Sequence, residues 1–571
     1  MLDLLIRNVA VVDGTGNPAY HANVGVAGGR IAFIHRGEVP CEAARVIGGR
    51  GLVCAPGFID VHTHSDTTII KNNRATNSLR AGVTTEATGQ CGSSVAPATG
   101  QAKDVTASRM ASKSGSSAGG AIDLSWESVD DWLQMLDHKG IGINIVPYVG
   151  HGTIRTVVMG REGSGGESIH PTPEQMQGMK DVLRQCMEQG AAGMSTGLEY
   201  PPGRYATTGE LIELAKVVAK YGGIHISHMR SEEELLLTAV KEIIAIAEGS
   251  GVASCVTHHK AFRQENWGKI RSTLAHIDEA RRRGLDVMCD FYPWEHSHEQ
   301  NMGSFFAVEF GTWSPRNTEE LLGVLKDDAK WASLRAALLE GEEKNFRLAE
   351  ARAQGLAKSG VTAPPRRDTI GRRVVVHSPA HPEVIGLNLR AAATALGYPT
   401  DHREGLRKLY VDDGGCTLVA GGPMWIEDIR LLVSYPWAAV STDSSTLDVP
   451  VDMTQPSGDM HPRNHGSYAR ILQQFVREEK LISLEMAIRK LTSLPASLLG
   501  LTDRGLLRPG CCADLCLFDP AEITNQATWA NPDAHPTGIK YVLVNGIVAV
   551  DNGKETRALA GKALRSARRP A

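Results

Sequence analysis

The feature that most constrains the fold is an alternation, through the middle of the chain, of short apolar runs with amphipathic helical patterns. A parallel strand reaches the next one through a crossover, which a helix normally supplies. Eight apolar runs have the length and punctuation of buried strands: Phe58–His64, Val83–Thr88, Ile143–Val149, Ala192–Thr196, Gly223–His228, Ala253–His258, Leu285–Asp290 and Ala438–Asp443. Intervening patterns predict helices over Pro173–Glu188, Thr208–Tyr221, Leu235–Gly249 and Ile270–Arg283. Together they predict an α/β fold, a (β/α)8 barrel of the TIM type.

The two ends of the chain have a different pattern of apolar residues from the middle. Residues 1–54 and 495–555 hold short alternating runs separated by turn signals such as Asp13-Gly14 and Gly28-Gly29. We predict that they form one small β-sandwich domain built from both termini, with the barrel over residues 55–494. The connection after the seventh strand, 295–434, is too long for a simple βα unit but carries helical patterns of its own, Thr318–Ala337 and Glu342–Lys358. We interpret it as an inserted helical lid over the barrel mouth; the alternative is a separate domain with its own function.

Composition excludes several classes of protein. The chain has 571 residues, of which 42% are hydrophobic, and its 60 basic residues nearly balance 64 acidic ones. This balance gives no electrostatic footprint for nucleic acid or a membrane surface, and no apolar stretch approaches the roughly 18–20 residues that span a bilayer. The amino-terminal sequence lacks the features of a signal peptide, so we expect a cytoplasmic protein. The 10 scattered cysteines favour reduced thiols over a disulfide framework.

Polar residues able to bind a metal or a substrate follow the predicted strands. In a (β/α)8 barrel the active site lies at the carboxyl ends of the strands, so these residues are expected to meet at one mouth. In chain order they are His62, His64, Cys91, His151, Arg155, Glu199, Tyr200, His228, Arg230, His258, His259, Lys260, Asp290, Tyr292 and Asp443.

The chemistry of this set points to zinc. On a strand, His62 and His64 would share one face, about 6.5–7 Å apart, although a bare His-x-His is also common among solvated or core histidines. Imidazole and thiolate suit zinc, and three protein ligands leave a position for a reacting water, whose pKa zinc lowers towards about 7. Asp443 could shuttle the proton of that water; its structural alternative is a helix N-cap. We expect Cys511, Cys512 and Cys516 to be packing residues.

The motifs resemble those of the amidohydrolase superfamily, and within it the N-acyl-D-amino-acid deacylase (D-aminoacylase) family, over nearly the whole chain. The matching segments are Gly89-Gln90-Cys91-Gly92, His151-Gly152-Thr153-Ile154-Arg155, Gly197-Leu198-Glu199-Tyr200-Pro201-Pro202-Gly203, His228-Met229-Arg230-Ser231-Glu232, His258-His259-Lys260, Asp290-Phe291-Tyr292-Pro293, Thr442-Asp443 and His461-Pro462-Arg463-Asn464-His465-Gly466. The resemblance implies that Cys91, His228 and His258 hold a tight zinc ion. It further implies that His62, His64 and Asp443 flank a second, weaker site.

The same resemblance suggests how a substrate is bound. Lys260, Tyr292, Arg230 and Arg463 resemble residues that receive the substrate carboxylate. Tyr200 resembles a residue that contacts the amide, and we place His151 with the substrate-binding residues. Many superfamily members bridge two metals with a carboxylated lysine on strand four, where this chain has Met194-Ser195-Thr196; this supports Cys91 as the bridging or principal ligand.

The resemblance therefore implies a zinc hydrolase that cleaves the linear amide of N-acyl-D-amino acids, with Asp443 as the catalytic residue. Gln90 and Thr442 depart from the family pattern and bear on substrate identity. One alternative is a cyclic amidase of hydantoinase or dihydroorotase type on the same barrel. Another is a non-catalytic homologue, although every ligand position is filled. The preferred acyl group and side chain, the number of catalytic metals and the oligomeric state stay open at this point.

Overall fold

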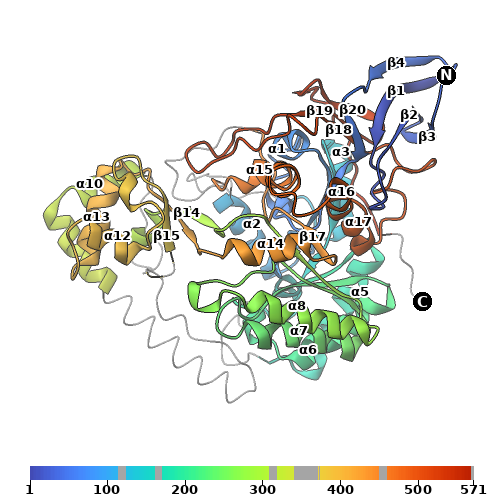
Figure 1. The fold of residues 1–571 in the computed structure, drawn as a ribbon. Helices are drawn as coiled ribbons and strands as arrows, with labels where there is room; N and C mark the ends of the chain where they lie inside the picture. The colour runs from blue at the N-terminus through green and yellow to red at the C-terminus, as the bar shows by residue number, and fades with distance from the viewer. Residues whose placement is uncertain are drawn as a thin grey trace.

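The computed structural model describes residues 1–113, 124–160, 170–307, 318–339, 371, 373–448 and 460–566 (Figure 1). It has a barrel, a β-sheet made from both ends of the chain, and a lobe inserted after a late barrel strand. Of the two helical patterns expected in the insertion, Glu342–Lys358 lies outside the described residues.

The barrel contains all eight strands expected from the sequence. The set of parallel barrel strands is β6 (Phe58–Asp60), β7 (Val83–Thr88), β8 (Asn144–Pro147), β10 (Gly193–Gly197), β11 (Ile224–His228), β12 (Ala253–Val256), β13 (Val287–Phe291) and β17 (Ala438–Val440), with the short β9 (Val149–Gly150) between β8 and β10.

Backbone contacts join the two runs of barrel strands into a ring. On one side, Ala192 N donates to Pro147 O at 2.8 Å. On the other, Thr63 forms a parallel bridge with Ser444, and Asp443 N donates to His62 O at 2.9 Å. The carboxyl ends of β6 and β17 therefore meet, which brings the two ends of a nearly 400-residue stretch of chain to one mouth.

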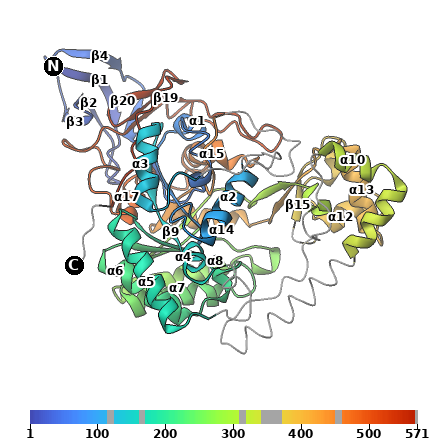
Figure 2. The same ribbon diagram turned by 180° about the vertical axis from the view of Figure 1, so that it is seen from behind.

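Amphipathic helices cover the outside of the barrel in chain order: α4 (His151–Met159), α5 (Pro173–Glu188), α6 (Thr208–Lys220), α7 (Leu236–Ser250) and α8 (Lys269–Arg282) (Figure 2). The start of α5 shows why the sequence folds this way. Thr172 accepts from Gln175 N while the Gln175 side chain accepts from Thr172 N, and a proline stands in the first turn. The helix then buries Met179, Leu183 and Met187 against the sheet.

The two ends of the chain form one continuous sheet. Its strand order is β21-β20-β19-β18-β5-β1-β2-β3, with β4 also paired to β1. The strands are β1 (Leu2–Val11), β2 (Tyr20–Ala27), β3 (Arg30–His35), β4 (Ala43–Gly48), β5 (Val53–Pro56), β18 (Leu515–Phe518), β19 (Ile539–Val544), β20 (Ile547–Asp551) and β21 (Lys554–Glu555). The junction between the ends is the antiparallel pair β5–β18. Inward residues of both ends, such as Val24 and Leu515, share one apolar core.

The insertion forms a lobe that stands beside the barrel (Figures 1 and 2). Helices α10 (Thr318–Leu325), α12 (Leu389–Ala395) and α13 (His402–Asp412) pack on a small antiparallel sheet of β14 (Glu299–Asn301), β16 (Leu418–Gly421) and β15 (Arg373–His377). The lobe is therefore not purely helical: the β-branched run Val374-Val375-Val376 favours a strand. The Thr318–Ala337 pattern is also interrupted after Leu325 before helix resumes at 328.

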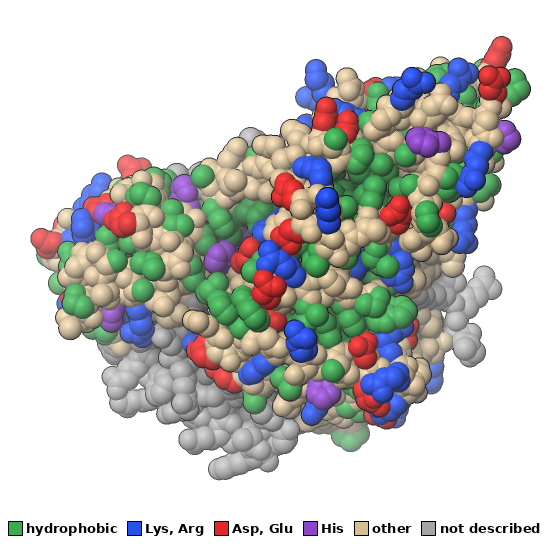
Figure 3. Space-filling view, viewed as in Figure 1, with side chains coloured by type: hydrophobic (Ala, Val, Ile, Leu, Met, Phe, Trp, Pro, Cys, Tyr) green, Lys and Arg blue, Asp and Glu red, His purple; other side chains and the backbone are tan. Residues whose placement is uncertain are grey.

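The last element of the insertion, α14 (Ile426–Ser434), packs against α8 and so belongs with the barrel wall. On the face shown in Figure 3, basic and acidic side chains are interspersed, in keeping with the small net charge of −4. Among the described residues, none of the helices is both long enough and apolar enough to cross a bilayer.

Candidate metal centre

The two histidines of the first strand lie just beyond it rather than on it. β6 ends at Asp60. The His62 N–H donates to Asp60 Oδ1 at 3.0 Å, so it is satisfied by this side chain and not by the backbone of a neighbouring strand. His62 and His64 still turn to the same side, and both approach one carboxylate: their Nε2 atoms lie 3.4 and 3.2 Å from Asp443 Oδ1. The shared orientation expected from the sequence is therefore produced by a loop held against Ser444.

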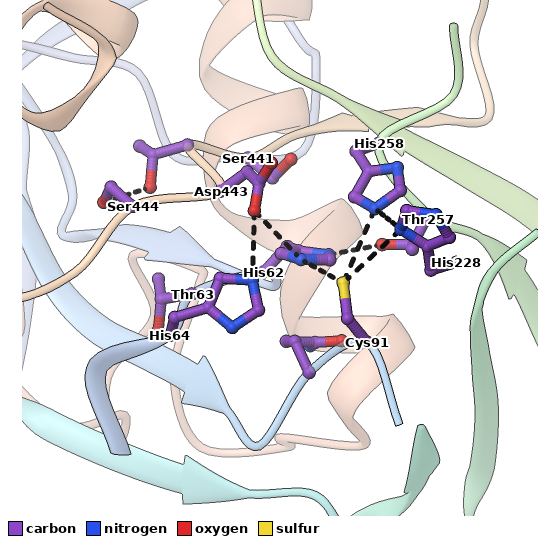
Figure 4. A network of polar contacts seen from close by, with 12 residues as sticks. His62, Thr63, His64, Cys91, His228, Thr257, His258, Ser441, Asp443 and Ser444 are labelled. Carbon is purple, nitrogen blue, oxygen red and sulfur yellow. Dashed lines mark hydrogen bonds and ion pairs between the residues drawn. The ribbon is translucent and has the colours of Figure 1, made fainter. Parts of the chain in front are cut away.

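The Cys91 sulfur lies at the centre of the predicted ligand set (Figure 4). Its Sγ atom is 3.5 Å from His62 Nε2, 3.5 Å from His258 Nε2 and 3.8 Å from His228 Nδ1. Two triads of donor atoms share this sulfur: His62, His64 and Cys91 on one side, and Cys91, His228 and His258 on the other. Strands that are far apart in the sequence thus place their ends around one point.

These distances fit a zinc site. With Zn–S near 2.3 Å and Zn–N near 2.05 Å, a tetrahedral centre has S···N edges of about 3.5 Å and N···N edges of about 3.3 Å. The three Cys91 distances match the first value. His228 Nδ1 and His258 Nε2 are 2.8 Å apart, closer than the second, so these two rings must part slightly to admit an ion. The set of one thiolate with imidazoles is borderline-soft, which suits zinc.

Hydrogen bonds outside the cluster orient the rings of His62 and His228. Thr257 Oγ1 donates to Asp290 Oδ2 at 2.5 Å, so the same oxygen accepts from His62 Nδ1–H, also at 2.5 Å. His228 donates through Nε2 to Glu199 Oε2 at 3.1 Å. His258 Nδ1 lies 2.8 Å from Glu232 Oε1 and 2.6 Å from Lys260 Nζ, so its contacts do not select one tautomer. For His62 and His228, the nitrogen that faces Cys91 is the one left available to a metal.

The electrostatics favour a thiolate and a carboxylate at the cluster. Burial lowers the pKa values of His62 and His228, but Cys91 and neighbouring carboxylates outweigh it and raise both, so a metal ion would displace protons from these rings. Burial raises the pKa of the Cys91 thiol, but His62 together with hydrogen bonds from His228 and His258 outweighs it and holds that pKa well below its usual value. For Asp443, burial is likewise overcome by Arg463, His62 and His64, which hold its pKa low. Arg463 Nη1 donates to Asp443 Oδ2 at 2.9 Å. Thiolate and carboxylate are the forms that bind metals.

Three members of the cluster have a backbone conformation that L-residues seldom adopt. Cys91, His258 and Asp443 have φ values of +54°, +33° and +53°. Such conformations cost about 1–3 kcal/mol each and cluster at functional sites. The close packing of the Cys91 loop adds to this constraint: a Cβ on Gly92 would lie 2.5 Å from Gly197 N.

Most predicted substrate-binding residues surround the cluster. Lys260 Nζ and the Arg463 guanidinium lie 5.4 and 5.1 Å from the centre of the Tyr292 ring. The Tyr292 hydroxyl is buried and has no hydrogen-bond partner among the described residues. Tyr200 donates to Cys91 O at 3.0 Å, and its ring packs edge-on against His228.

Two predicted residues point elsewhere. The Arg230 guanidinium is held by the Glu242 carboxylate and the carbonyls of Arg204 and Ala206. His151 Nε2 pairs with Glu210 Oε1 at 2.9 Å, and Glu210 is also bound by Arg155. Arg230 therefore fastens the end of β11 to α7, and His151 fastens the start of α4 to α6. These contacts are made with residues outside the Cys91 cluster.

Sequence reasoning did not assign roles to the residues that orient the ligands. Glu199, Glu232, Thr257 and Asp290 each lie within one or two positions of a predicted ligand, a motif residue or a strand end. This closeness in sequence is the only feature that could have marked them as residues that orient the ligands. Their function depends on side-chain direction, which the sequence does not specify.

Comparison with known proteins agrees with this geometry. Residues 417–550 match the model of the Amidohydrolase family. The chain is 31% identical to the N-acyl-D-glutamate deacylase of Alcaligenes xylosoxydans xylosoxydans, over 95% of this chain and 93% of that one. It is 30% identical to the D-aminoacylase of the same organism, over 98% and 97% of the two chains.

Solved structures give the same relationship. The N-acyl-D-glutamate deacylase of Bordetella bronchiseptica, complexed with zinc and a phosphonate mimic of the tetrahedral intermediate, superimposes with a TM-score of 0.71 at 30% identity, covering 99% of each chain. A D-hydantoinase from Thermus has a TM-score of 0.53 at 15% identity over 99% of each chain and shares the fold alone. This chain belongs to the N-acyl-D-amino-acid deacylase (D-aminoacylase) family of amidohydrolases.

Proposed function

We propose that this protein is a zinc-dependent hydrolase that cleaves the amide of N-acyl-D-amino acids, releasing a carboxylate and the free D-amino acid. The observation that carries the proposal is the position of Cys91 Sγ, 3.5–3.8 Å from imidazole nitrogens of His62, His228 and His258. Cys91, His228 and His258 would hold the tighter ion. His62, His64 and Asp443 would flank a second, weaker site that shares the sulfur.

Zinc bound there would supply an activated water and a positive charge opposite the developing oxyanion. Asp443 would act as general base and then general acid, because its Oδ1 lies between His62 and His64 and faces the cluster. Its other oxygen is held by Arg463, which fixes the direction of the proton-accepting lone pair. The same carboxylate would return the proton to the leaving nitrogen.

The substrate carboxylate would bind at Tyr292, Lys260 and Arg463. The buried Tyr292 hydroxyl offers a donor, and two cationic side chains flank its ring. Both cations already have carboxylate partners, Glu232 at 2.7 Å from Lys260 and Asp443 at 2.9 Å from Arg463. A substrate carboxylate would therefore join an existing charge network, which keeps both side chains in position before binding.

The test is a panel of N-acetyl amino acids of both hands, with a hydantoin beside them, incubated with protein of known zinc content. We expect amine release from the D-substrates, little from their L-enantiomers, and no release after chelation. Ring opening of the hydantoin in preference to the linear amides would replace this proposal with a cyclic amidase. Stoichiometric zinc without turnover of any amide would indicate a non-catalytic homologue.

A further inference from the structure

A cavity of about 190 Å³ opens beside the metal centre, on the side away from the proposed carboxylate site. Cys91 and Tyr200 form its inner end, and its outer wall is α2 (Gln101–Lys113) with Ala102, Val105 and Thr106. Helix α4 and the Pro201-Pro202-Gly203 turn complete it. Nothing in the carboxylate-binding or proton-transfer scheme above uses this space.

We propose that this cavity, called here the α2 cavity, binds the acyl chain of the substrate and selects uncharged acyl groups of about four to six carbons over acetyl. The inference rests on the proposed deacylase function. The α2 cavity adjoins the ends of β7 and β10, whereas Lys260 and Tyr292 follow β12 and β13. With the amino-acid carboxylate at Lys260 and Tyr292 and the scissile carbon beside Cys91, the acyl half extends towards α2.

The size of the α2 cavity suits a chain longer than acetyl. In another protein, an engineered cavity of about 150 Å³ lined by apolar side chains holds benzene. The α2 cavity is somewhat larger, so a butanoyl or hexanoyl chain fits where acetyl would leave most of it unfilled. Ala102, Val105 and Pro202 supply apolar surface, and the backbone of Gly92, Gly152 and Gly203 supplies close walls without side chains.

The charges at the α2 cavity favour an uncharged chain. Among its described lining residues, Arg109 carries a guanidinium, and Asp66 accepts from that group at 3.1 and 3.3 Å. Asp66 is itself buried and also accepts from Val95 N. The cation is thus already balanced by a fixed partner, so an acidic acyl group would gain little there.

The experiment compares N-acetyl-, N-butanoyl- and N-hexanoyl-D-methionine with the zinc-loaded protein and its variants. Each fully buried methylene is expected to raise kcat/KM about fourfold, so the four extra methylenes of hexanoyl give a ceiling of roughly 250-fold over acetyl. Burial of only two of the four would still give about tenfold, which is the smallest ratio that we expect. Thr106→Phe, which places a ring in the α2 cavity, should lower the hexanoyl-to-acetyl ratio at least about tenfold. Ala102→Leu is the milder second variant and should lower it severalfold.

Ser108→Phe, on the exposed face of the same helix, is the matched control and should leave the ratio within about twofold of the parent. A hexanoyl-to-acetyl ratio near one in the parent, or a ratio unchanged by both filling variants, would overturn the assignment. The assignment would also be overturned if Thr106→Phe or Ala102→Leu changed the ratio of kcat/KM for N-acetyl-D-phenylalanine to that for N-acetyl-D-alanine and left the hexanoyl-to-acetyl ratio unchanged. The α2 cavity would then hold the amino-acid side chain. Absence of hydrolysis of every D-substrate by the parent would instead refute the deacylase function itself.

Discussion

Replacing Thr257 by valine tests whether the buried hydrogen-bond chain behind His62 holds that ring ready for a metal. The substitution keeps the volume and removes one hydroxyl. In the parent, this hydroxyl accepts from His62 Nδ1 and donates to Asp290 Oδ2, both at 2.5 Å, and all three side chains are fully buried. In the variant, the His62 proton and one Asp290 oxygen both lose this hydrogen bond.

The magnitude follows from this count. A buried polar group left unsatisfied costs about 1–3 kcal/mol, so two such groups should lower the free energy of unfolding by about 2–6 kcal/mol. Asp290 keeps its bonds from His258 N and Ser441 Oγ, which favours the lower half of that range. The His62 ring is then free to carry its proton on Nε2, which faces Asp443 and Cys91. Loss of such an orienting partner typically weakens metal binding 10–100-fold.

Two measurements separate these effects: urea unfolding of the metal-free protein, and zinc titration against a competing chelator. Thr257→Ser should restore both. Thr273→Val is the matched control, because Thr273 Oγ1 pairs with His259 Nε2 at 2.7 Å in the same barrel wall. It should cost similar stability without changing zinc affinity. If Thr257→Val and the parent bind zinc equally tightly, the hydrogen-bond chain does not orient His62, and the reasoning fails.

Other substitutions probe the cluster more directly. Asp443→Asn should retain zinc and lose about 10²–10⁴-fold in kcat, because it removes the proton acceptor; parental turnover would exclude that role. Cys91→Ala should reduce bound zinc in elemental analysis, whereas Cys186→Ala, which removes another buried thiol, should not; equal zinc content in both would remove Cys91 from the ligand set. Glu232→Gln leaves the Lys260 charge without its buried partner and should lower the free energy of unfolding by about 3–5 kcal/mol. Glu234→Gln, at a more exposed pair with Arg263, should cost under about 1 kcal/mol in the same urea titration, and similar costs for the two would contradict this account.

The strands and their order were predictable because they depend on short-range patterns. Runs such as Ala253–His258 are apolar, short and bounded by helical periodicity, so their type and approximate position follow from the sequence alone. Barrel closure then brings their ends together, whatever the details of each loop. The same patterns could not show that β6 stops at Asp60, because that end depends on the Asp60 carboxylate bonding to His62 N.

Side-chain direction was the part that sequence could not supply. Arg230 and Lys260 both stand two residues after a histidine at a strand end, and both were predicted to receive a carboxylate. Lys260 turns inward to Glu232 and the cluster, whereas Arg230 turns outward to Glu242 on α7. The difference is decided by which buried carboxylate each cation can reach, since an unpaired buried charge is strongly unfavourable.

The backbone conformation of Cys91, at the barrel mouth, lowers the stability of the fold locally in favour of the site. Cys91 adopts φ +54° within a Gly-x-Cys-Gly turn whose glycines, Gly89 and Gly92, also have positive φ. Glycine would occupy the Cys91 position without steric cost, so a β-carbon there is a local disadvantage to folding. The thiol it carries points at three imidazoles. A residue that is strained, buried and surrounded by lone-pair donors is hard to explain by packing; it is well explained if a metal ion joins those donors and supplies the stabilisation that the loop lacks.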